Sequence, residues 1–226
     1  MRGKLIVFEG VEGGGKTTQM QRLRLWLLES DWIWQFADRV PRVVVTREPG
    51  GTELGARLRR LLLEHGTGEP IQDRAELLLY AADRAQHVED FLKPELTKGS
   101  IVLCDRFTDS TIAYQGYGRG LSLDLIEQVN TLATGGLQSD LTLWLDLEVE
   151  TGLARARARG TSDRMEQADL GFHRRVQRGF AELARRYPER IVRVDGSRSE
   201  QLVAEEIQAI VTRKLLGWGY GKKGEG

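Results

Sequence analysis

The 226-residue sequence contains one cysteine, no apolar run long enough to cross a bilayer, and no excess of charge of either sign. A single cysteine, Cys104, excludes an intramolecular disulfide, and its place in the apolar run IVLCD predicts a small buried core residue. A membrane span needs roughly 18 consecutive apolar residues, and the opening MRGKLIVFEG lacks a signal-peptide cleavage pattern. We therefore expect a cytoplasmic protein that does not enter a membrane.

The charge balance argues against a nucleic-acid binder. Lys plus Arg and Asp plus Glu both number 33, so the formal net charge is zero. A general nucleic-acid binder is basic overall, and we expect no nucleic-acid partner. His65, His87 and His173 show no metal-ligand spacing with one another or with Cys104, which predicts structural or surface roles for them.

Short apolar runs alternate with helical patterns along the chain. Continuous apolar runs are typical of strands buried on both faces of a parallel sheet, and the helices between them indicate βαβ units. The sequence predicts an α/β fold with a five-stranded parallel sheet flanked by helices, in a single domain over 1–216 with a flexible glycine-rich tail at 217–226. The predicted strands are 4–9, 42–46, 100–104, 141–146 and 190–194, and the predicted helices are 16–30, 53–64, 72–97, 122–133, 147–158, 165–187 and 199–215. The tryptophan-rich connection 31–41 is equally consistent with core, a partner surface or a local cluster.

The stretch FEGVEGGGKTT, residues 8–18, fits the phosphate-binding pattern GxxxxGK[ST] between a predicted strand and a predicted helix. Glycines let backbone N–H groups turn inward around an anion, and the helix N-terminus adds partial positive charge. Lys16 supplies a full charge, whereas Glu12 has the wrong sign for phosphate and needs its own explanation. The predicted phosphate-binding residues are Gly10, Val11, Glu12, Gly13, Gly14, Gly15, Lys16, Thr17 and Thr18.

A metal site is predicted beside this loop. Asp105 ends the strand IVLCD, where a Walker B-type carboxylate belongs, and the Thr17 hydroxyl can ligate Mg²⁺. The alternative is that Asp105 caps the helix that follows, and the two roles are compatible.

The distribution of arginines predicts a second phosphate-binding site. Arg47 follows the second predicted strand, Arg106 follows the third, and RARARGTSDR over 155–164 carries four more. No guanine-reading Asn-Lys-x-Asp stretch of a GTPase is present, and a kinase that joins two anionic substrates needs such cations. A glycine followed by threonine and serine at 160–162 breaks the helix there, which favours a mobile lid around 155–165 over a solvated helix face.

The motifs FEGVEGGGKTT, TREPGGTELG, LLYAADRAQHV, CDRFTDSTIAYQG, DLTLWLD and RARARGTSDRME occur in the order seen in thymidylate kinases. The chain resembles that family from about residue 3 to about residue 195. The resemblance implies a P-loop nucleoside-monophosphate-kinase-like fold. It also implies transfer of the γ-phosphoryl group of ATP to dTMP, giving dTDP for dTTP synthesis, with Mg²⁺ and in a homodimer.

The resemblance also implies an acceptor site. Glu12 is similar to the family carboxylate that faces the deoxyribose, so that it would accept a hydrogen bond from the 3′-hydroxyl; the alternative is a solvent-facing side chain. Arg47 and Arg106 resemble the arginines that grip the 5′-phosphate, and the bond before Pro49 is often cis in relatives. The residues so implied to bind dTMP are Glu12, Arg47, Tyr80, Arg84, Arg106, Thr111, Tyr114 and Gln115, with Tyr80 stacking on thymine and Arg84 meeting a base carbonyl.

Gly13 stands where some relatives have arginine, and the arginines here lie in the lid instead. This resembles the bacterial type, which implies that Arg159 reaches the transferring phosphoryl group, with Arg155 backing it up or pairing with phosphate. The implied catalytic residues are Lys16, Arg159, Glu12 and Arg106. The alternative functions are another nucleoside monophosphate kinase, a P-loop switch without turnover, and a non-catalytic homologue.

Overall fold

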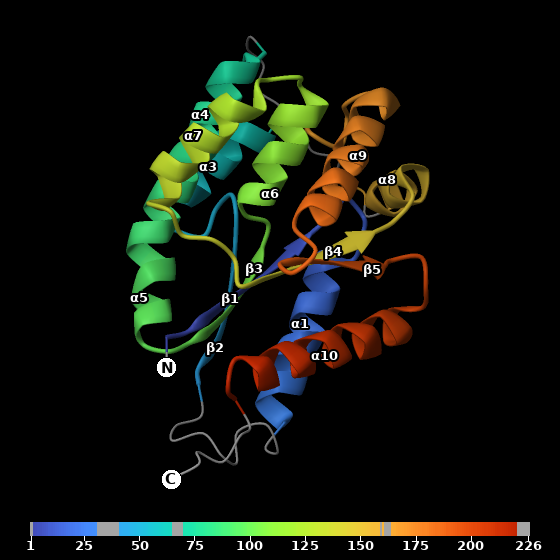
Figure 1. Ribbon diagram of the computed structural model, residues 1–226. Helices are drawn as coiled ribbons and strands as arrows, with labels where there is room; N and C mark the ends of the chain where they lie inside the picture. Colours follow the sequence, from blue (N-terminus) through green and yellow to red (C-terminus); the bar gives the residue numbers. More distant parts are fainter. Residues whose placement is uncertain (1, 31–40, 65–69, 159, 161–163, 221–226) are drawn as a thin grey trace.

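The computed structural model describes residues 2–30, 41–64, 70–158, 160 and 164–220. These residues form a five-stranded parallel sheet flanked by helices, which confirms the predicted fold class (Figure 1). The strands are β1 Lys4–Glu9, β2 Val43–Arg47, β3 Ile101–Asp105, β4 Leu141–Asp146 and β5 Ile191–Asp195. The helices are α1 Lys16–Glu29, α3 Glu53–Leu63, α4 Asp73–His87, η1 Val88–Leu92, α5 Lys93–Thr97, α6 Thr108–Thr111, η2 Ile112–Gly118, α7 Leu123–Thr134, α8 Val149–Ala158, α9 Leu170–Arg186 and α10 Glu200–Gly217.

The strand order β2-β3-β1-β4-β5 places β1 in the middle of the sheet. From β1 the chain passes to the outer strand β2, returns to place β3 between β2 and β1, and then crosses to β4 and β5 on the other side. In such a sheet the crevice beyond the carboxyl ends of the strands, at the point where the winding reverses, is where ligands bind. The loop that follows β1 and the turn that follows β3 therefore meet at one edge of the sheet.

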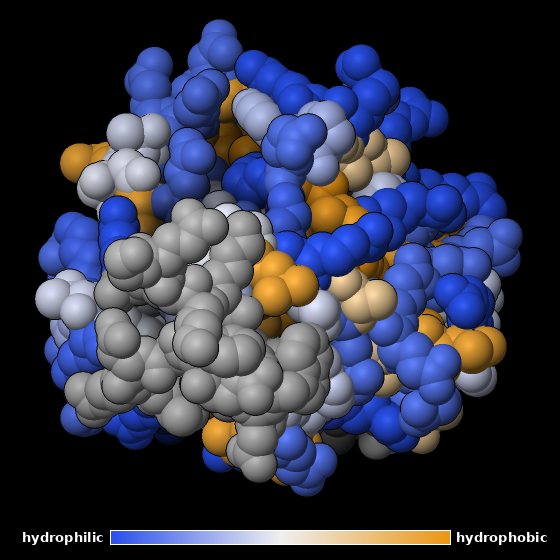
Figure 2. Space-filling model, turned by 60° about the horizontal axis from the view of Figure 1, so that its bottom comes forward, coloured by the Kyte–Doolittle hydropathy of each residue, from blue (hydrophilic) through white to orange (hydrophobic). Residues whose placement is uncertain are grey.

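Side chains of the central strand alternate between two cores, which explains the continuous apolar runs. Ile6 and Phe8 pack with α1 and α10 on one face, whereas Leu5 and Val7 pack with η1 and α5 on the other. Cys104 belongs to the second core and is fully buried, as predicted. The end of the molecule that carries α1 and α10 has a described surface that is mostly hydrophilic, with small separate apolar patches (Figure 2).

The helix predicted over 72–97 is interrupted in the structure. It runs as α4, the π-helical segment η1 and α5, and Pro94 lies in the first turn of α5. Because proline has no N–H to donate, the regular α-helical pattern cannot continue through it unchanged.

The helices α6 and η2 were absent from the predicted elements. Their sequence contains β-branched residues and glycines, which have low helix propensity, and packing against α9 stabilises them instead. A Cβ on Gly118 would lie 2.6 Å from the Phe172 ring, so the glycine permits this close contact.

Most predicted boundaries lie within two residues of the observed ones, and the start of α9 is the exception. Helix α9 begins at Leu170 rather than 165, because Asp169 caps it by accepting from the backbone N–H of Phe172. Helix α10 extends to Gly217, two residues beyond its predicted end at 215, and Tyr220 is buried against the core. Residues 221–226, and 31–40 of the tryptophan-rich connection, lie outside the described residues. None of the helices described is long and apolar enough to span a bilayer.

Candidate functional site

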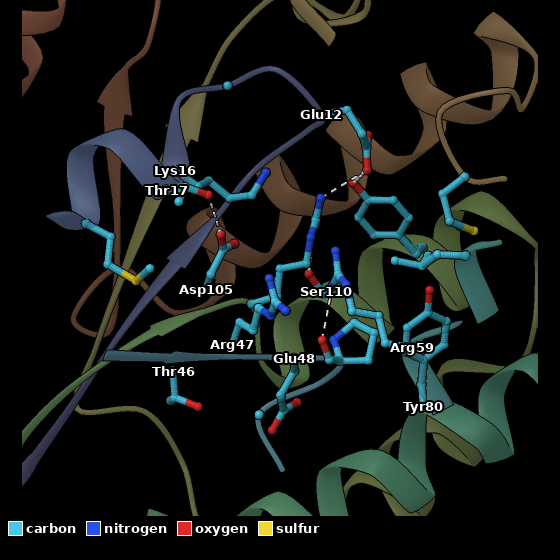
Figure 3. A pocket seen from close by; sticks show the side chains of 18 of the residues that line it. Glu12, Lys16, Thr17, Thr46, Arg47, Glu48, Arg59, Tyr80, Asp105 and Ser110 are labelled. Atoms are coloured by element: carbon cyan, nitrogen blue, oxygen red, sulfur yellow. Dashed lines mark hydrogen bonds and ion pairs between the residues drawn. The ribbon is translucent and has the colours of Figure 1, made fainter. Parts of the chain in front are cut away.

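A cavity of about 550 Å³ opens at the carboxyl edge of the strands. Thr17 and Asp105 lie toward one end of it and Tyr80 and Arg59 toward the other, with Arg47 between them (Figure 3). The predicted site residues that line it are Glu12, Gly13, Gly14, Gly15, Lys16, Thr17, Thr18, Arg47, Tyr80, Arg84, Asp105, Arg106, Thr111, Tyr114 and Gln115. The structure therefore brings the loop and the predicted acceptor residues to one cavity.

The phosphate-binding loop connects β1 to α1. Gly10, Gly13 and Gly15 have positive φ, the conformation that turns backbone N–H groups toward a common centre. Lys16 Nζ donates to the carbonyl oxygens of Gly10 and Val11 at 3.0 and 2.9 Å. Burial and the neighbouring Arg106 lower the pKa of Lys16 to about 8, so it stays mainly cationic at neutral pH.

The backbone of the loop lies directly against the backbone of α8. A Cβ on Gly13 would lie 2.0 Å from the carbonyl oxygen of Gly152, and a Cβ on Gly152 would lie 2.4 Å from that of Glu12. This contact explains why position 13 is glycine here, since no larger side chain fits without moving α8. Helix α8, whose last residues begin the predicted lid, is thus packed directly on the loop.

Thr17 and Asp105 meet across the sheet edge. The Thr17 hydroxyl donates to Asp105 Oδ2 at 2.9 Å. The alternative that Asp105 caps the next helix is wrong, because α6 begins at Thr108 and Phe107 occupies its N-cap position. The described residues contain no group of three His, Cys, Asp or Glu side chains that could hold a metal by themselves.

Arg106 links the loop to the turn after β3. It is the only described residue other than glycine with positive φ, 72°. Its guanidinium donates to Glu12 Oε1 at 3.0 Å and to Ser110 Oγ at 3.1 Å, and it lies 4.8 Å from the centre of the Tyr114 ring. An uncommon backbone conformation at a charged residue persists only where surrounding contacts hold it.

Glu12 is buried rather than solvent-facing. Tyr114 Oη donates to its Oε1 at 2.6 Å, while His173 Nδ1 lies 3.5 Å from its Oε2. Burial by itself would raise the pKa of Glu12, but His173 and the charges of Arg106 and Lys16 outweigh it and lower that pKa. Tyr114 therefore anchors Glu12, a role distinct from the expected place beside base and sugar.

Glu9, the last residue of β1, holds the same turn from beneath. It is fully buried, and its Oε1 accepts from the backbone N–H groups of Phe107 and Ser110 at 2.9 and 3.1 Å. Its Oε2 accepts from Ser110 Oγ at 2.6 Å. Burial raises the pKa of Glu9 to about 7, and the nearby Arg106 only partly opposes this rise.

Arg84 is engaged differently from the prediction. It is buried and donates to Glu48 Oε2, Thr111 Oγ1, Asn130 Oδ1 and the carbonyl oxygen of Phe107. These bonds engage four of its five N–H groups, so that at most one remains for a ligand. Its main contribution is to hold together the connections around the acceptor end.

Glu48 is the carboxylate of that network. It accepts from Arg84 at 2.8 Å, and His87 Nδ1 lies 2.8 Å from its Oε1. The Glu48–Pro49 peptide bond is cis, as expected from the family resemblance. Arg47, one residue earlier, is exposed at the end of β2 and lines the cavity.

The predicted lid is only partly described. Arg155 lies exposed on α8 and does not line the cavity. Arg159 and the stretch 161–163 lie outside the described residues. Arg164, in contrast, is directed to the buried carboxylate of Glu76 on α4.

Sequence reasoning missed several residues that build the site, namely Glu9, Arg59, Glu76, Ser110 and His173. Ser110 lies in the motif CDRFTDSTIAYQG, within the stretch between Arg106 and Thr111 that the resemblance had already assigned to the site. Arg59 lines the cavity, whereas Glu9, Glu76 and His173 contact residues that line it. Tertiary packing places all four, and their residue types alone carry no signal.

Comparisons with known proteins agree with this geometry. The family model described as thymidylate kinase matches residues 8–207. A thymidylate kinase from Trichodesmium erythraeum is 60% identical over 97% of this chain and 100% of that protein, and one from Nostoc punctiforme is 61% identical over 96% and 99%. A crystal structure of thymidylate kinase from Ehrlichia chaffeensis superposes with a TM-score of 0.74 at 34% identity, covering 93% of this chain and 100% of that one.

We expect Glu9 to make stability depend on pH. Because its folded-state pKa of about 7 exceeds the ordinary 4.5, its stabilising contribution is full at acid pH and is lost as pH rises toward 7. Relative to Glu9→Gln, the wild type should lose on the order of 3 kcal/mol of unfolding free energy between about pH 5 and pH 8. Urea denaturation of both proteins across this pH range measures the difference in unfolding free energy. Parallel pH profiles for the two proteins would refute the raised pKa of Glu9.

Proposed function

The chain belongs to the thymidylate kinase family and phosphorylates dTMP, and we propose that it does so by holding ATP and dTMP end to end in the cavity described above. The family model and the full-length relatives support the activity. The observation that carries the proposal is that the phosphate-binding loop and two acceptor-side arginines open onto one cavity.

At the donor end, the loop amides and the N-terminus of α1 bind the phosphates of ATP. Lys16 adds the full positive charge that the outer phosphates need. Its present acceptors are two loop carbonyls, which are weaker partners than a phosphate, so that the side chain can exchange them for the nucleotide.

The donor end also suits Mg²⁺. Thr17 and Asp105 present a hydroxyl and a carboxylate oxygen 2.9 Å apart beside the loop. Mg²⁺ prefers oxygen ligands and is commonly held by one or two protein groups, with substrate phosphates and water as the others. When bound, the ion would neutralise charge on the phosphates of ATP.

At the acceptor end, Arg47 and Arg106 bind the 5′-phosphate of dTMP as charge-assisted partners. Glu12 Oε2 is buried and makes no hydrogen bond among the described residues, with His173 Nδ1 3.5 Å away, which suits an oxygen that accepts from the 3′-hydroxyl. Tyr80 stacks on the base, and Thr111 and Gln115 line the same part of the cavity.

The transfer itself needs positioning and charge neutralisation rather than a strong base. Arg106 donates to Glu12 and to the carbonyl oxygen of Gly10, so the acceptor-side arginine is held against the donor loop. This arrangement places the two phosphate-binding ends of the cavity in fixed register before the substrates bind.

Further features of the enzyme follow as proposals. Residues 1–216 act as one kinase domain with a lid around 155–165, and the enzyme works in the cytoplasm, where both nucleotides are available. The single buried cysteine is consistent with a reducing compartment.

Turnover across acceptors tests the function. The purified protein with ATP and Mg²⁺ should convert dTMP to dTDP with a kcat/KM well above that for AMP, UMP or CMP, and Arg106→Ala should lower kcat/KM for dTMP by ~10² or more. A protein that prefers another monophosphate would be the alternative kinase, and one that binds ATP without turnover would be the switch.

Arg159 is proposed as the lid residue that stabilises the transferring phosphoryl group. Its replacement by alanine should lower kcat by on the order of 10³, because an arginine finger acts on transition-state charge. Arg157→Ala is the matched control, since Arg157 is an exposed arginine two residues away on α8. Equal, near-normal kcat values for the two variants would reject the role of Arg159.

A homodimer is proposed through α3, α4 and α7, which lie together at one side of the molecule (Figure 1). Exposed leucines gather on these helices: Leu54, Leu61, Leu78 and Leu132. Exposed apolar side chains on helices that pack side by side suit an interface with a second copy of the chain.

Light scattering should find a dimer that Leu78→Glu dissociates, because burying the new charge at an apolar interface is unfavourable. The control is Leu25→Glu on α1, a comparably exposed leucine away from these helices, which should remain dimeric. A monomeric wild type would contradict the proposal.

A further inference from the structure

A buried carboxylate lies behind the acceptor end of the cavity and joins three segments of the chain. Glu76 on α4 is fully buried. It accepts from Gln115 Nε2 at 2.8 Å, from Arg119 at 3.2 Å, and from Arg164. Of these partners, Gln115 lines the cavity, and Arg164 directly precedes two residues that also line it, Met165 and Glu166.

The contact with Glu76 determines which way the Gln115 amide points. Burial acting alone would raise the pKa of Glu76, but hydrogen bonds from Gln115, Arg119 and Arg164 together lower it, so that the carboxylate is ionised. An ionised carboxylate only accepts hydrogen bonds, and the amide atom facing it must therefore be nitrogen. This leaves the amide oxygen of Gln115 for the cavity.

An amide oxygen fixed in this way distinguishes pyrimidine bases. Thymine carries a donor, N3–H, on its pairing edge, whereas cytosine carries an acceptor at N3. An oxygen presented to that edge accepts from thymine and meets the lone pair of cytosine instead. Sites built to pair with a particular donor reject analogues that lack it strongly, because the buried polar groups are left unpaired.

The two arginines hold the carboxylate in place. Arg119 lies 4.7 Å from the centre of the Phe172 ring, and Arg164 Nε donates to the carbonyl oxygen of Leu62 at 2.9 Å. Glu76 thus has two cationic partners, and its Oε1 accepts from both Arg119 and the Gln115 amide. Rotation of the amide would turn its oxygen toward the carboxylate, which is repulsive.

We propose that Glu76 is a positioning residue for base selection, which fixes the Gln115 amide so that its oxygen reads the N3–H of thymine. The inference rests on the proposed dTMP site and adds to it the device that sets its preference for a base with a donor at N3. Glu76 itself does not touch the substrate, and it acts through Gln115.

The test is the ratio of kcat/KM for dTMP to that for dCMP. In Glu76→Gln the partner can donate as well as accept, so the Gln115 amide can turn over, and the ratio should fall by ~10². The control is Glu95→Gln, another buried carboxylate paired with a lysine and a serine, Lys98 and Ser100, outside the cavity, which should keep the wild-type ratio. A folded Glu76→Gln enzyme with an unchanged ratio overturns the proposal.

The reciprocal double variant Glu76→Gln with Gln115→Glu separates orientation from simple structural damage. The double variant restores one amide and one carboxylate in contact and again leaves an accepting oxygen for the base. Its ratio of kcat/KM for dTMP to that for dCMP should therefore be at least ten-fold higher than that of Glu76→Gln. A ratio that stays low in a folded double variant also overturns the proposal.

The wild type supplies an independent check whether or not the variants fold. A wild-type ratio of kcat/KM for dTMP to that for dCMP below ~10² would mean that no fixed oxygen reads the base edge. That result would overturn the proposal for Glu76 and leave the proposed function intact. Absence of turnover with dTMP would instead contradict the function on which the inference rests.

Discussion

The ion pair between Glu12 and Arg106 is the interaction on which the rest of the site depends. It joins the phosphate-binding loop after β1 to the turn after β3, with 3.0 Å between Arg106 Nη2 and Glu12 Oε1. Both partners are largely removed from water, where a charge pair is worth more than at a surface and where either partner alone would be costly. A glutamate in a phosphate-binding loop, which has the wrong sign for phosphate, is thereby explained: it holds the arginine of the acceptor site and keeps one oxygen for the acceptor.

Glu9, Ser110 and Tyr114 support this pair by hydrogen bonds. Glu9 accepts two backbone N–H groups of the turn and so supports the positive φ of Arg106. Tyr114 donates to Glu12 from η2, and its pKa is raised well above the usual range by burial, so the phenol remains a donor. A site with this many fixed polar groups requires little reorganisation when charge develops in the reaction.

The sequence was sufficient to predict the sheet and most of the residues that line the cavity. Apolar runs and a glycine-rich loop are local signals, and the parallel topology then brings Lys16, Asp105 and Arg47 to one edge of the sheet by necessity. The sequence was insufficient to predict roles that depend on burial. The N–H groups of Arg84 are engaged inside the protein. Glu76 has partners that are distant in the sequence. The helices α6 and η2 escaped prediction for the same reason, since contact with α9 outweighs their weak intrinsic propensity.

The most direct measurement is a double-mutant cycle on Glu12→Gln and Arg106→Lys, with kcat/KM for dTMP as the readout. If the two side chains act as one unit across the junction of donor and acceptor sites, the double variant should be at least ten-fold more active than the product of the single effects predicts, about 1.4 kcal/mol of coupling. Effects that multiply independently would mean that the pair does not connect the two ends of the cavity.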